Sequence, residues 1–482
     1  MPQILRSQLL NTLPAEWPRD VFPEIQHRVQ TDGRKVVVLD DDPTGTQTVH
    51  NVPVLTEWTL EILKAELSND LACFYVLTNS RALPLREAEV LNTLIGERLM
   101  QAAREVHCEL VVVSRSDSTL RGHYPGEVDA LAAALGGRFD ATLIIPSFIP
   151  GGRHTINDVH YVAGVRDSDI WLTPAGETEF AKDKAFGYVN SNLREWVEEK
   201  THGQVRAGDV VTITLKDIRE GGPDWVCERL LALRNRAGSS SHNHSHVCII
   251  NAASDQDLAV AVLGILQAES AGAKFLFRTA ASFVPLRAGI APKPLLQRED
   301  LLPATHHSTA GGLIVVGSYV PKTSGQLAAL LNLGVRGIEV QVSQLLDDAG
   351  REGEIRRAIV QTNASLELGE DTVLYTSREL VAGSDAASSL AVGQRISNSL
   401  VSMVRGLSAV PRYVLAKGGI TSSDVATQAL GVRRALVLGQ VLAGVPVWQL
   451  GPETKYPNVP YIVFPGNVGG EQALAEVVAM LR

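Results

Sequence analysis

Three consecutive aspartates, Asp40 to Asp42, directly follow a short apolar run at positions 36–39 that is rich in β-branched residues. Such a run is typical of a buried parallel strand. In open α/β sheets, ligands bind where the carboxyl ends of the strands meet. Carboxylates at that edge could accept hydrogen bonds from hydroxyl groups or hold a cation. A solvated loop would explain one acid, but three adjacent carboxylates repel one another, which favours a functional site.

Polar clusters also follow three other predicted strands, in the sequences TNSR, SRSDSTLRGH and PSFIPGGRHT. Any one of them alone is better explained as a cap or a loop ion pair. Arginine binds carboxylates in a bidentate manner, and aspartate and hydroxyl groups suit the hydroxyls of a polyol. Together the clusters predict a cleft for a small, anionic, hydroxylated molecule. Their charged members are Arg81, Arg115, Asp117, Arg121, Arg153 and His154.

Two glycine-rich turns lie in the last third of the chain, KGGITSSD at 417–424 and PGNVGG at 465–470. The first stands between a predicted strand and a helix expected from about Ser422. Glycines let the backbone approach a ligand, and a helix N-terminus presents free N–H groups to phosphate. The order GxxxxGK[ST] of a Walker A loop is absent. These turns therefore predict a phosphate-binding nest of another kind, with simple glycine caps as the alternative.

Alternating strand and helix patterns position these groups and predict an α/β fold of two α/β domains, each with a mostly parallel sheet flanked by helices. The length of 482 residues suits two domains. We expect an N-terminal domain at 1–290, a linker at 291–310 and a C-terminal domain at 311–482. Positions 150–190 are expected to be a long irregular stretch, of the kind that is often functional.

The composition excludes several classes of protein. A net charge of -9 argues against a general nucleic-acid binder. The four cysteines are far apart and form no CxxC pair, so neither a zinc site nor a disulfide framework is expected. No signal peptide is evident and no stretch reaches the roughly 18 apolar residues of a membrane span. We therefore expect a cytoplasmic protein. The run at 238–246, GSSSHNHSH, is expected to be a solvated loop.

The motifs resemble those of the four-carbon acid sugar kinase family along nearly the whole chain. The segment LDDDPTGTQ is similar to the family's opening DD-x-TG, with Asp41 and Asp42 on its two aspartates. The segments SDSTLRG, NSR and PSFIPGGRHT resemble its DSTLRG, arginine-turn and PAFP-x-x-GR elements. Better-known members have DDFTGA where this chain has DDDPTGTQ, a departure that concerns the substrate more than the reaction.

The resemblance implies that the N-terminal domain binds a sugar acid, that the C-terminal domain binds ATP, and that the active site lies in the interdomain cleft. Erythronate, threonate and their oxo forms are the substrates it suggests. The expected substrate contacts are Asp41, Asp42, Arg81, Arg115, Ser116, Asp117 and Ser118, to which the sequence pattern adds Arg153. The expected ATP contacts are Ser318, Gly418, Gly419, Ile420 and Thr421, with Gly466 or Gly469 from the second turn.

The hypothesis is therefore phosphoryl transfer from ATP to a hydroxyl of a short sugar acid. Such transfer requires alignment of the reacting groups, neutralisation of the charge on the phosphates and a base near the hydroxyl. Asp42 and Asp117 are the candidate catalytic residues, and Arg81 or Arg115 is the candidate clamp for the substrate carboxylate. Mg²⁺ would bridge the phosphates, and no protein residue is assigned as its ligand. No membrane or nucleic-acid partner is expected, and a homodimer stays open.

Two alternatives remain. Asp40 and Asp42 also fit the DxDxTG pattern of haloacid-dehalogenase-like phosphatases, with Asp40 as nucleophile and Asp42 as its acid-base partner. A sugar-acid sensor without catalysis could use the same cleft. Consumption of ATP separates the kinase from both.

Overall fold

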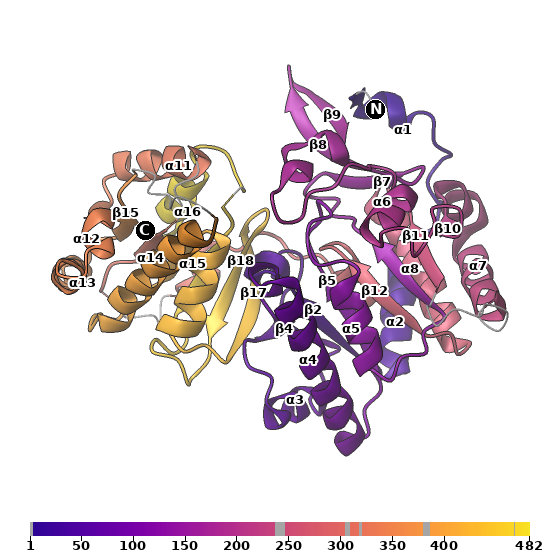
Figure 1. The fold of residues 1–482 in the computed structure, drawn as a ribbon, viewed down its shortest axis with the longest axis horizontal. Helices are drawn as coiled ribbons and strands as arrows, with labels where there is room; N and C mark the ends of the chain where they lie inside the picture. Colours follow the sequence, from indigo (N-terminus) through magenta and orange to yellow (C-terminus); the bar gives the residue numbers. More distant parts are fainter. Residues whose placement is uncertain (1–2, 237–245, 304–308, 318–320, 379–385, 467) are drawn as a thin grey trace. The chain divides into compact units, whose positions relative to one another are not determined.

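The computed structural model describes residues 3–236, 246–303, 309–317, 321–378, 386–466 and 468–482. They form two compact units (Figure 1). The first comprises Met1–Val49 and Glu57–Pro292, and the second comprises His50–Thr56 and Lys293–Arg482. Each unit has its own sheet and its own hydrophobic core, so each is described by itself.

A parallel sheet is the centre of the first unit. Its order is β10-β11-β6-β12-β5-β2-β4, and every neighbouring pair in that order is parallel. The strands are almost entirely apolar and buried, as expected where helices flank both faces. They are β2 (Lys35–Asp40), β4 (Cys73–Leu77), β5 (Leu110–Arg115), β6 (Ala141–Ile145), β10 (Val211–Ile213), β11 (His246–Ile250) and β12 (Phe275–Thr279).

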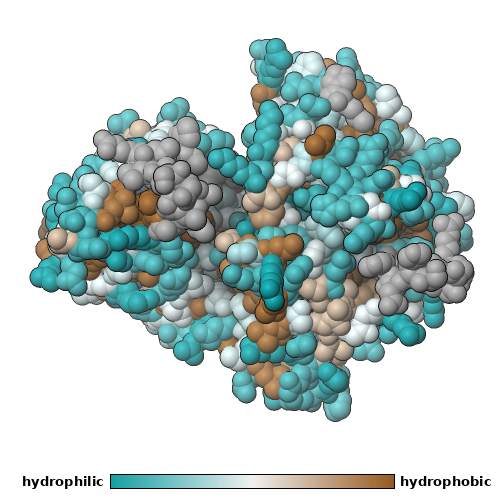
Figure 2. Space-filling model, in the orientation of Figure 1, coloured by the Kyte–Doolittle hydropathy of each residue, from teal (hydrophilic) through white to brown (hydrophobic). Residues whose placement is uncertain are grey.

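Two groups of helices flank this sheet. In the first group α4 packs against both α3 and α5, and in the second α8 packs against α2, α7 and α9. Their bounds are α2 (Phe22–Asp32), α3 (Leu60–Leu67), α4 (Leu85–Val106), α5 (Gly126–Ala134), α7 (Gly222–Arg236), α8 (Asp255–Ser270) and α9 (Phe283–Arg287). Figure 2 shows hydrophilic residues over most of the visible surface, with hydrophobic residues gathered over α4. On that helix Leu85, Val90 and Leu94 are exposed.

Most of the stretch 150–190 is regular, contrary to the sequence expectation, whereas 175–190 has neither strands nor α-helices. It contains β7 (Arg153–Ile156), β8 (Val159–Arg166) and β9 (Asp169–Pro174), which pair antiparallel and are extended by β1 (Ile4–Leu5). The turns are two-residue hairpins at 157–158 and 167–168, with positive φ at each residue. Asn, Asp and Ser tolerate this conformation. The polar pairs Asn157-Asp158 and Asp167-Ser168 are therefore hairpin turns.

The second unit has a mixed sheet of order β3-β17-β18-β19-β16-β13-β15-β14. The pairs from β19 to β14 are parallel, and those from β3 to β19 are antiparallel. The strands are β3 (Val52–Leu55), β13 (Leu313–Val316), β14 (Arg336–Val340), β15 (Thr372–Thr376), β16 (Val414–Lys417), β17 (Arg434–Leu442), β18 (Val445–Leu450) and β19 (Pro460–Phe464). Strand β3 is thus supplied by the first part of the chain.

The helices of the second unit are α10 (Arg298–Leu301), α11 (Pro321–Asn332), α12 (Val342–Leu346), α13 (Arg351–Glu367), α14 (Ala386–Gly406), α15 (Gly419–Asp424) and α16 (Ala473–Leu481). The core lies between the sheet and helices such as α11 and α16, and Ile314, Leu415, Ile462 and Leu474 are fully buried in it. The predicted class, two α/β domains with mostly parallel sheets flanked by helices, is confirmed.

Candidate functional site

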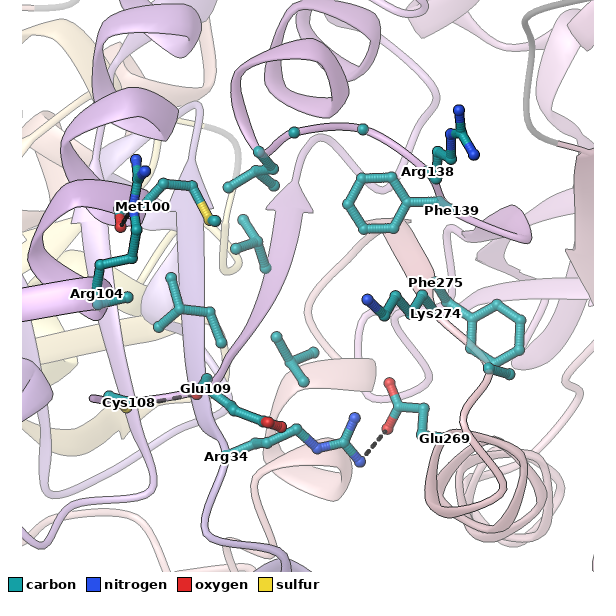
Figure 3. A pocket seen from close by; sticks show the side chains of 18 of the residues that line it. Arg34, Met100, Arg104, Cys108, Glu109, Arg138, Phe139, Glu269, Lys274 and Phe275 are labelled. Carbon is teal, nitrogen blue, oxygen red and sulfur yellow. Dashed lines mark hydrogen bonds and ion pairs between the residues drawn. The ribbon is translucent and has the colours of Figure 1, made fainter.

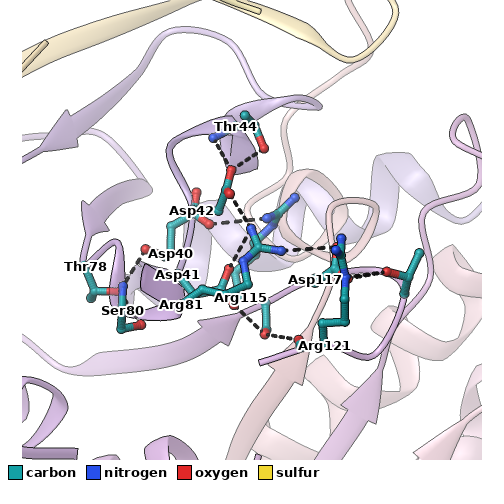
Figure 4. Close-up of polar contacts among 12 residues, drawn as sticks. Asp40, Asp41, Asp42, Thr44, Thr78, Ser80, Arg81, Arg115, Asp117 and Arg121 are labelled. Atoms are coloured by element: carbon teal, nitrogen blue, oxygen red, sulfur yellow. Dashed lines mark hydrogen bonds and ion pairs between the residues drawn. The ribbon is translucent and has the colours of Figure 1, made fainter. Parts of the chain in front are cut away.

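The polar clusters of the first unit meet at one edge of its sheet because strand register aligns their starting points. Asp40 at the end of β2 lies opposite Arg115 at the end of β5 and Leu77 at the end of β4. Thr279 of β12 also lies opposite Arg115. Each following loop therefore begins at the same level, and Figure 4 shows the side chains that converge there.

Arg81 is the cation that this cluster shares. Its guanidinium lies 2.5 Å from Asp42 Oδ2, 3.4 Å from Asp117 Oδ1 and 3.7 Å from Asp41 Oδ1. Figure 4 shows Arg81 between Asp42 and Asp117. Desolvation alone would lower the pKa of Arg81, but the surrounding carboxylates outweigh it and raise that pKa. The structure thus brings together residues that sequence reasoning assigned from three separate loops.

Asp42 and Asp117 are held ionised. Burial alone would raise the pKa of Asp42, but Arg81 and hydrogen bonds from Thr44 outweigh it and hold that pKa below its usual value. The pKa of Asp117 is likewise lowered, because Arg81, Arg121 and a hydrogen bond from Thr119 outweigh desolvation. These two side chains keep 20% and 14% of their surface exposed. Both can therefore meet a ligand as hydrogen-bond acceptors.

Asp40 has a different environment from its two neighbours. Its side chain is 2% exposed, and Oδ1 lies 3.3 Å from Arg115 Nη1. Burial raises the pKa of Asp40 to about 8. A Cβ added at Gly45 would stand 1.9 Å from Asp40 Oδ2, so glycine is required where the turn crosses this carboxyl group. Because Asp40 is covered in this way, it is poorly placed to attack a phosphate as a nucleophile.

Asp41 is positioned by Ser116, which is in turn held by Arg278, a residue that sequence reasoning missed. Ser116 Oγ donates to Asp41 Oδ2 at 2.7 Å and receives a hydrogen bond from Arg278 Nη2 at 3.2 Å. Arg278 is 1% exposed and lies 5.4 Å from the ring centroid of Trp196. Gly122, with φ of 124°, lets the backbone pass this group, since a Cβ there would lie 2.7 Å from Ser116 Oγ. Arg278 is the last residue but one of the strand FLFRT, and a charge near the end of that otherwise apolar strand was the available signal.

Ser118 and Arg153 complete the set of predicted residues in this unit. Ser118 is buried, and its carbonyl accepts a hydrogen bond from His160 Nε2 at 2.8 Å. Burial lowers the pKa of His160 to about 4, so its imidazole is neutral. The guanidinium of Arg153 lies 5.9 Å from the Phe180 ring centroid and its Nε is buried without a hydrogen-bond partner. Among the described residues, Arg153 forms no ion pair.

The second unit presents backbone rather than side-chain charges at the corresponding edge of its sheet. Val316, Lys417 and Phe464 are aligned at the ends of β13, β16 and β19. Gly317 and Gly418 follow directly, and Gly466 follows after Pro465. Helix α15 begins at Gly419, three residues before the expected start near Ser422, because Gly418 with φ of 111° acts as its N-cap. Both glycines of KGG are therefore at the turn itself.

Lys417 joins the two glycine turns and was not among the predicted binding residues. Its buried Nζ donates to the carbonyls of Pro465 at 2.6 Å and Gly466 at 3.1 Å, and it lies 4.5 Å from the Phe464 ring centroid. Burial, with a smaller contribution from Lys322, lowers the pKa of Lys417 to about 7. Here too, a charged residue at the end of an apolar strand, VLAK, was the signal.

The other predicted residues of this unit differ in exposure. Ile420 is 63% exposed and Thr421 is buried beside Gly317. A Cβ at Gly466 would meet nothing within 4 Å, whereas one at Gly469 would lie 2.4 Å from the Ala473 Cβ. Open space beside a glycine is what a phosphate-binding turn offers. Ser318 lies outside the described residues.

The donor groups of the described residues do not form a metal cage. No group of three or more His, Cys, Asp or Glu side chains there is arranged to hold a metal ion. Mg²⁺ in phosphoryl-transfer sites commonly keeps water ligands and binds substrate phosphates with one or two carboxylates, which this chain could supply from Asp42 or Asp117.

Two family models match the two parts of the chain that contain these sheet edges. Residues 36–286 match a family model described as a sugar-binding N-terminal domain, and residues 313–474 match a nucleotide-binding C-terminal domain. The chain belongs to the four-carbon acid sugar kinase family. The charged cluster lies in the sugar-binding part of this family's architecture, and the glycine turns lie in its nucleotide-binding part.

Solved structures show the same fold. A Haemophilus influenzae protein assigned to a domain family of unknown function is 17% identical, with a TM-score of 0.60 over 92% of this chain and 100% of that chain. A Salmonella typhimurium LT2 protein described as a candidate tRNA synthase is 15% identical, with a TM-score of 0.64 over 93% and 98% of the two chains. No curated protein matches the chain. Within the described part of this family member, no helix has the length and apolar character needed to cross a membrane.

Proposed function

We propose that this chain is an ATP-dependent kinase that phosphorylates a hydroxyl of a short sugar acid, with erythronate, threonate and oxo-tetronates as the candidate substrates. The observation that supports it best is the cluster around Arg81, where two ionised and partly exposed carboxylates lie beside guanidinium groups. Such a cluster suits hydroxyl groups and an anion together. We assign the sugar acid to residues 1–290 and the nucleotide to residues 311–482.

Asp42 and Asp117 are the proposed catalytic residues. Both accept hydrogen bonds in their ionised form and both are more exposed than Asp40 and Asp41, so they can orient the attacking hydroxyl and receive its proton. In our proposal Asp41, Ser116 and Ser118 shape the floor of the substrate site.

Arg153 is the proposed clamp for the substrate carboxylate. Sequence reasoning favoured Arg81 or Arg115 for this role, but carboxylates of the chain already surround both. Arg153 has no such partner among the described residues, and burial lowers its pKa, so an incoming carboxylate would compensate its charge.

The glycine turns are the proposed ATP site. The backbone of Gly418, Gly419, Ile420 and Thr421 would face the phosphates, with Gly466 or Gly469 opposite and Lys417 fixing the second turn. By resemblance, Ser318 would add a contact. Bound Mg²⁺ would neutralise charge on the phosphates.

The test is ADP production over a panel of four-carbon and five-carbon sugar acids with Mg²⁺ and ATP. We expect ADP only when a matching acid is present, and loss of at least about 100-fold in turnover for Asp42→Asn and Asp117→Asn. Asp348→Asn is a matched control, because the Asp348 side chain is 92% exposed in the second unit. If both site variants stay within about threefold of wild type, the assigned roles are wrong.

Acid-induced stabilisation without product would favour a sensor. Phosphate release from a sugar phosphate without nucleotide would favour a phosphatase, a reading that the burial of Asp40 disfavours.

A further inference from the structure

A pocket of about 670 Å³ lies in the first unit, at the amino ends of the parallel strands. Its lining includes Arg34 before β2, Leu110 at the start of β5 and Phe275 at the start of β12. Asp40 and Arg115 lie at the other ends of β2 and β5. The pocket is therefore on the edge of the sheet opposite the charged cluster, and its volume lies in the range of small-molecule sites.

One part of the pocket lining is apolar. Leu110, Val112 and Leu135 line it, together with Met100 and Phe139. In Figure 3 the Met100 sulfur and the Phe139 ring face the space between the drawn side chains. A ligand that fills the pocket therefore needs a hydrocarbon or aromatic part.

The acidic residues of the pocket lie on one side of it, so they compensate only some of its cations. Both acids are at Arg34, since Glu269 lies 3.4 Å from it and Figure 3 shows Glu109 beside it. Glu269 also pairs with the buried Arg287 at 2.7 Å. Compensation of charge is thus concentrated on one side of the pocket.

Arg104, Arg138 and Lys274 also line the pocket, and none of them forms an ion pair among the residues that the structure describes. Figure 3 shows the Lys274 ammonium directed toward the space between the side chains, whereas Arg138 points away from it. Since the whole chain has a net charge of -9, a surplus of cations around an apolar hollow is a local feature and not a reflection of composition.

We propose that this pocket is a second binding site, separate from the proposed kinase site, for a small amphipathic anion: an aromatic or branched hydrocarbon that bears one carboxylate or phosphate group. The apolar part packs on Leu110, Val112 and Phe139, and the anionic group meets the Lys274 ammonium, while Arg104, whose Nε donates to the Met100 carbonyl, adds positive charge to the lining.

The test uses two fluorescent probes on the full chain. 8-Anilinonaphthalene-1-sulfonate is an aromatic anion whose sulfonate stands in for the carboxylate or phosphate, and N-phenyl-1-naphthylamine is its neutral counterpart without the sulfonate. We expect the sulfonate to bind saturably and at least about tenfold more tightly than the neutral probe, and to stay bound at saturating ATP. Displacement by phenyl phosphate or by 3-phenylpropionate then shows which anionic group the site prefers.

The variants are Arg104→Glu/Lys274→Glu and the neutral pair Arg104→Gln/Lys274→Gln. Arg104 and Lys274 are both exposed. Thermal unfolding verifies that each variant is folded. We expect the charge-reversed pair to remove the preference for the sulfonate and the neutral pair to reduce it. Arg166→Glu is the matched control, because Arg166 is a 72% exposed arginine on β8. The proposal is overturned if the sulfonate does not bind, if ATP displaces it, if both pairs bind it as wild type does, or if Arg166→Glu weakens it equally.

Discussion

At the carboxyl edge of each sheet, aligned strand ends bring several loops together, but the residues of those loops differ in kind between the two units. In the first unit the strand ends are followed by buried carboxylates and guanidiniums that neutralise one another, as around Arg81. In the second unit glycines follow β13 and β16 directly and follow β19 after Pro465, and Lys417 at the end of β16 is buried. A side-chain site depends on charge balance, so it is sensitive to any change of charge. A backbone site depends on φ and on open space, so it is sensitive to a Cβ.

The largest effect should follow from Arg81→Ala. It leaves Asp42 and Asp117 facing each other without their shared cation, and removal of one partner from a buried ion pair costs about 3–5 kcal/mol. We expect turnover to fall by about 100-fold or more, since misplaced catalytic groups lose that much. Urea unfolding and steady-state kinetics measure the two effects. Arg81→Lys retains the charge and should lose much less stability; equal losses in both variants would show that charge balance is not what matters.

The next effect should follow from Gly418→Ala, which tests the backbone site. A side chain at φ of 111° costs about 1–3 kcal/mol of strain, and relief of that strain would move the turn. We expect the KM for ATP to rise at least about tenfold while the KM for the acid changes little. Gly431→Ala is the control. Like Gly418, Gly431 has a positive φ, and a Cβ added at Gly431 would meet nothing within 4 Å. A similar rise in that variant would mean that strain anywhere in the unit explains the result.

A smaller effect should follow from Lys417→Met, which keeps the volume but removes two hydrogen bonds to the second glycine turn. We expect a several-fold weaker affinity for ATP and an altered pH dependence of stability. Burial lowers the pKa of Lys417 to about 7, against about 10.4 in an unfolded chain. Its contribution to stability is therefore complete above pH 10.4 and is lost as the pH falls through 7. Urea unfolding between pH 7 and 10 should show a rise in wild type that is reduced in the variant; identical slopes would contradict this.

The effect that we expect to be confined to stability is the pH response of Asp40→Asn. Burial raises the pKa of Asp40 to about 8, against about 3.9 when unfolded. The stability contributed by the retained proton is complete below pH 3.9 and is lost as the pH rises through 8. The free energy of unfolding should therefore fall less steeply in the variant than in wild type between pH 4 and 8. An unchanged difference between the two across that window would show that Asp40 is ionised in the folded chain.

How far the sequence predicted these edges depends on how local each feature is. Strand ends and the residues directly after them are set by short patterns, so the groups around Asp42, Arg81 and Asp117 and the KGG turn were identified in advance. Long-range pairing is not local. Arg278 reaches Ser116 across 162 positions, and β3 pairs with β17 nearly 380 residues later.

Exposure is also a property of packing and not of a motif. Asp40, Asp41 and Asp42 are equivalent in the sequence, yet only Asp42 retains substantial exposed surface. The hairpins at 153–174 were missed for a different reason. Their Asn-Asp and Asp-Ser turns lie between alternating strands, which is a recognisable signal that the polarity of the stretch concealed.

The most direct test of this division between the two edges is a crossed binding experiment. The affinities of wild type, Arg153→Gln and Gly418→Ala are measured by calorimetry for a non-hydrolysable ATP analogue and for the sugar acid with the highest turnover. We predict that Arg153→Gln weakens the acid about tenfold or more and leaves the nucleotide unchanged, and that Gly418→Ala does the reverse. Equal weakening of both ligands in both variants, or the opposite pattern, would contradict the account.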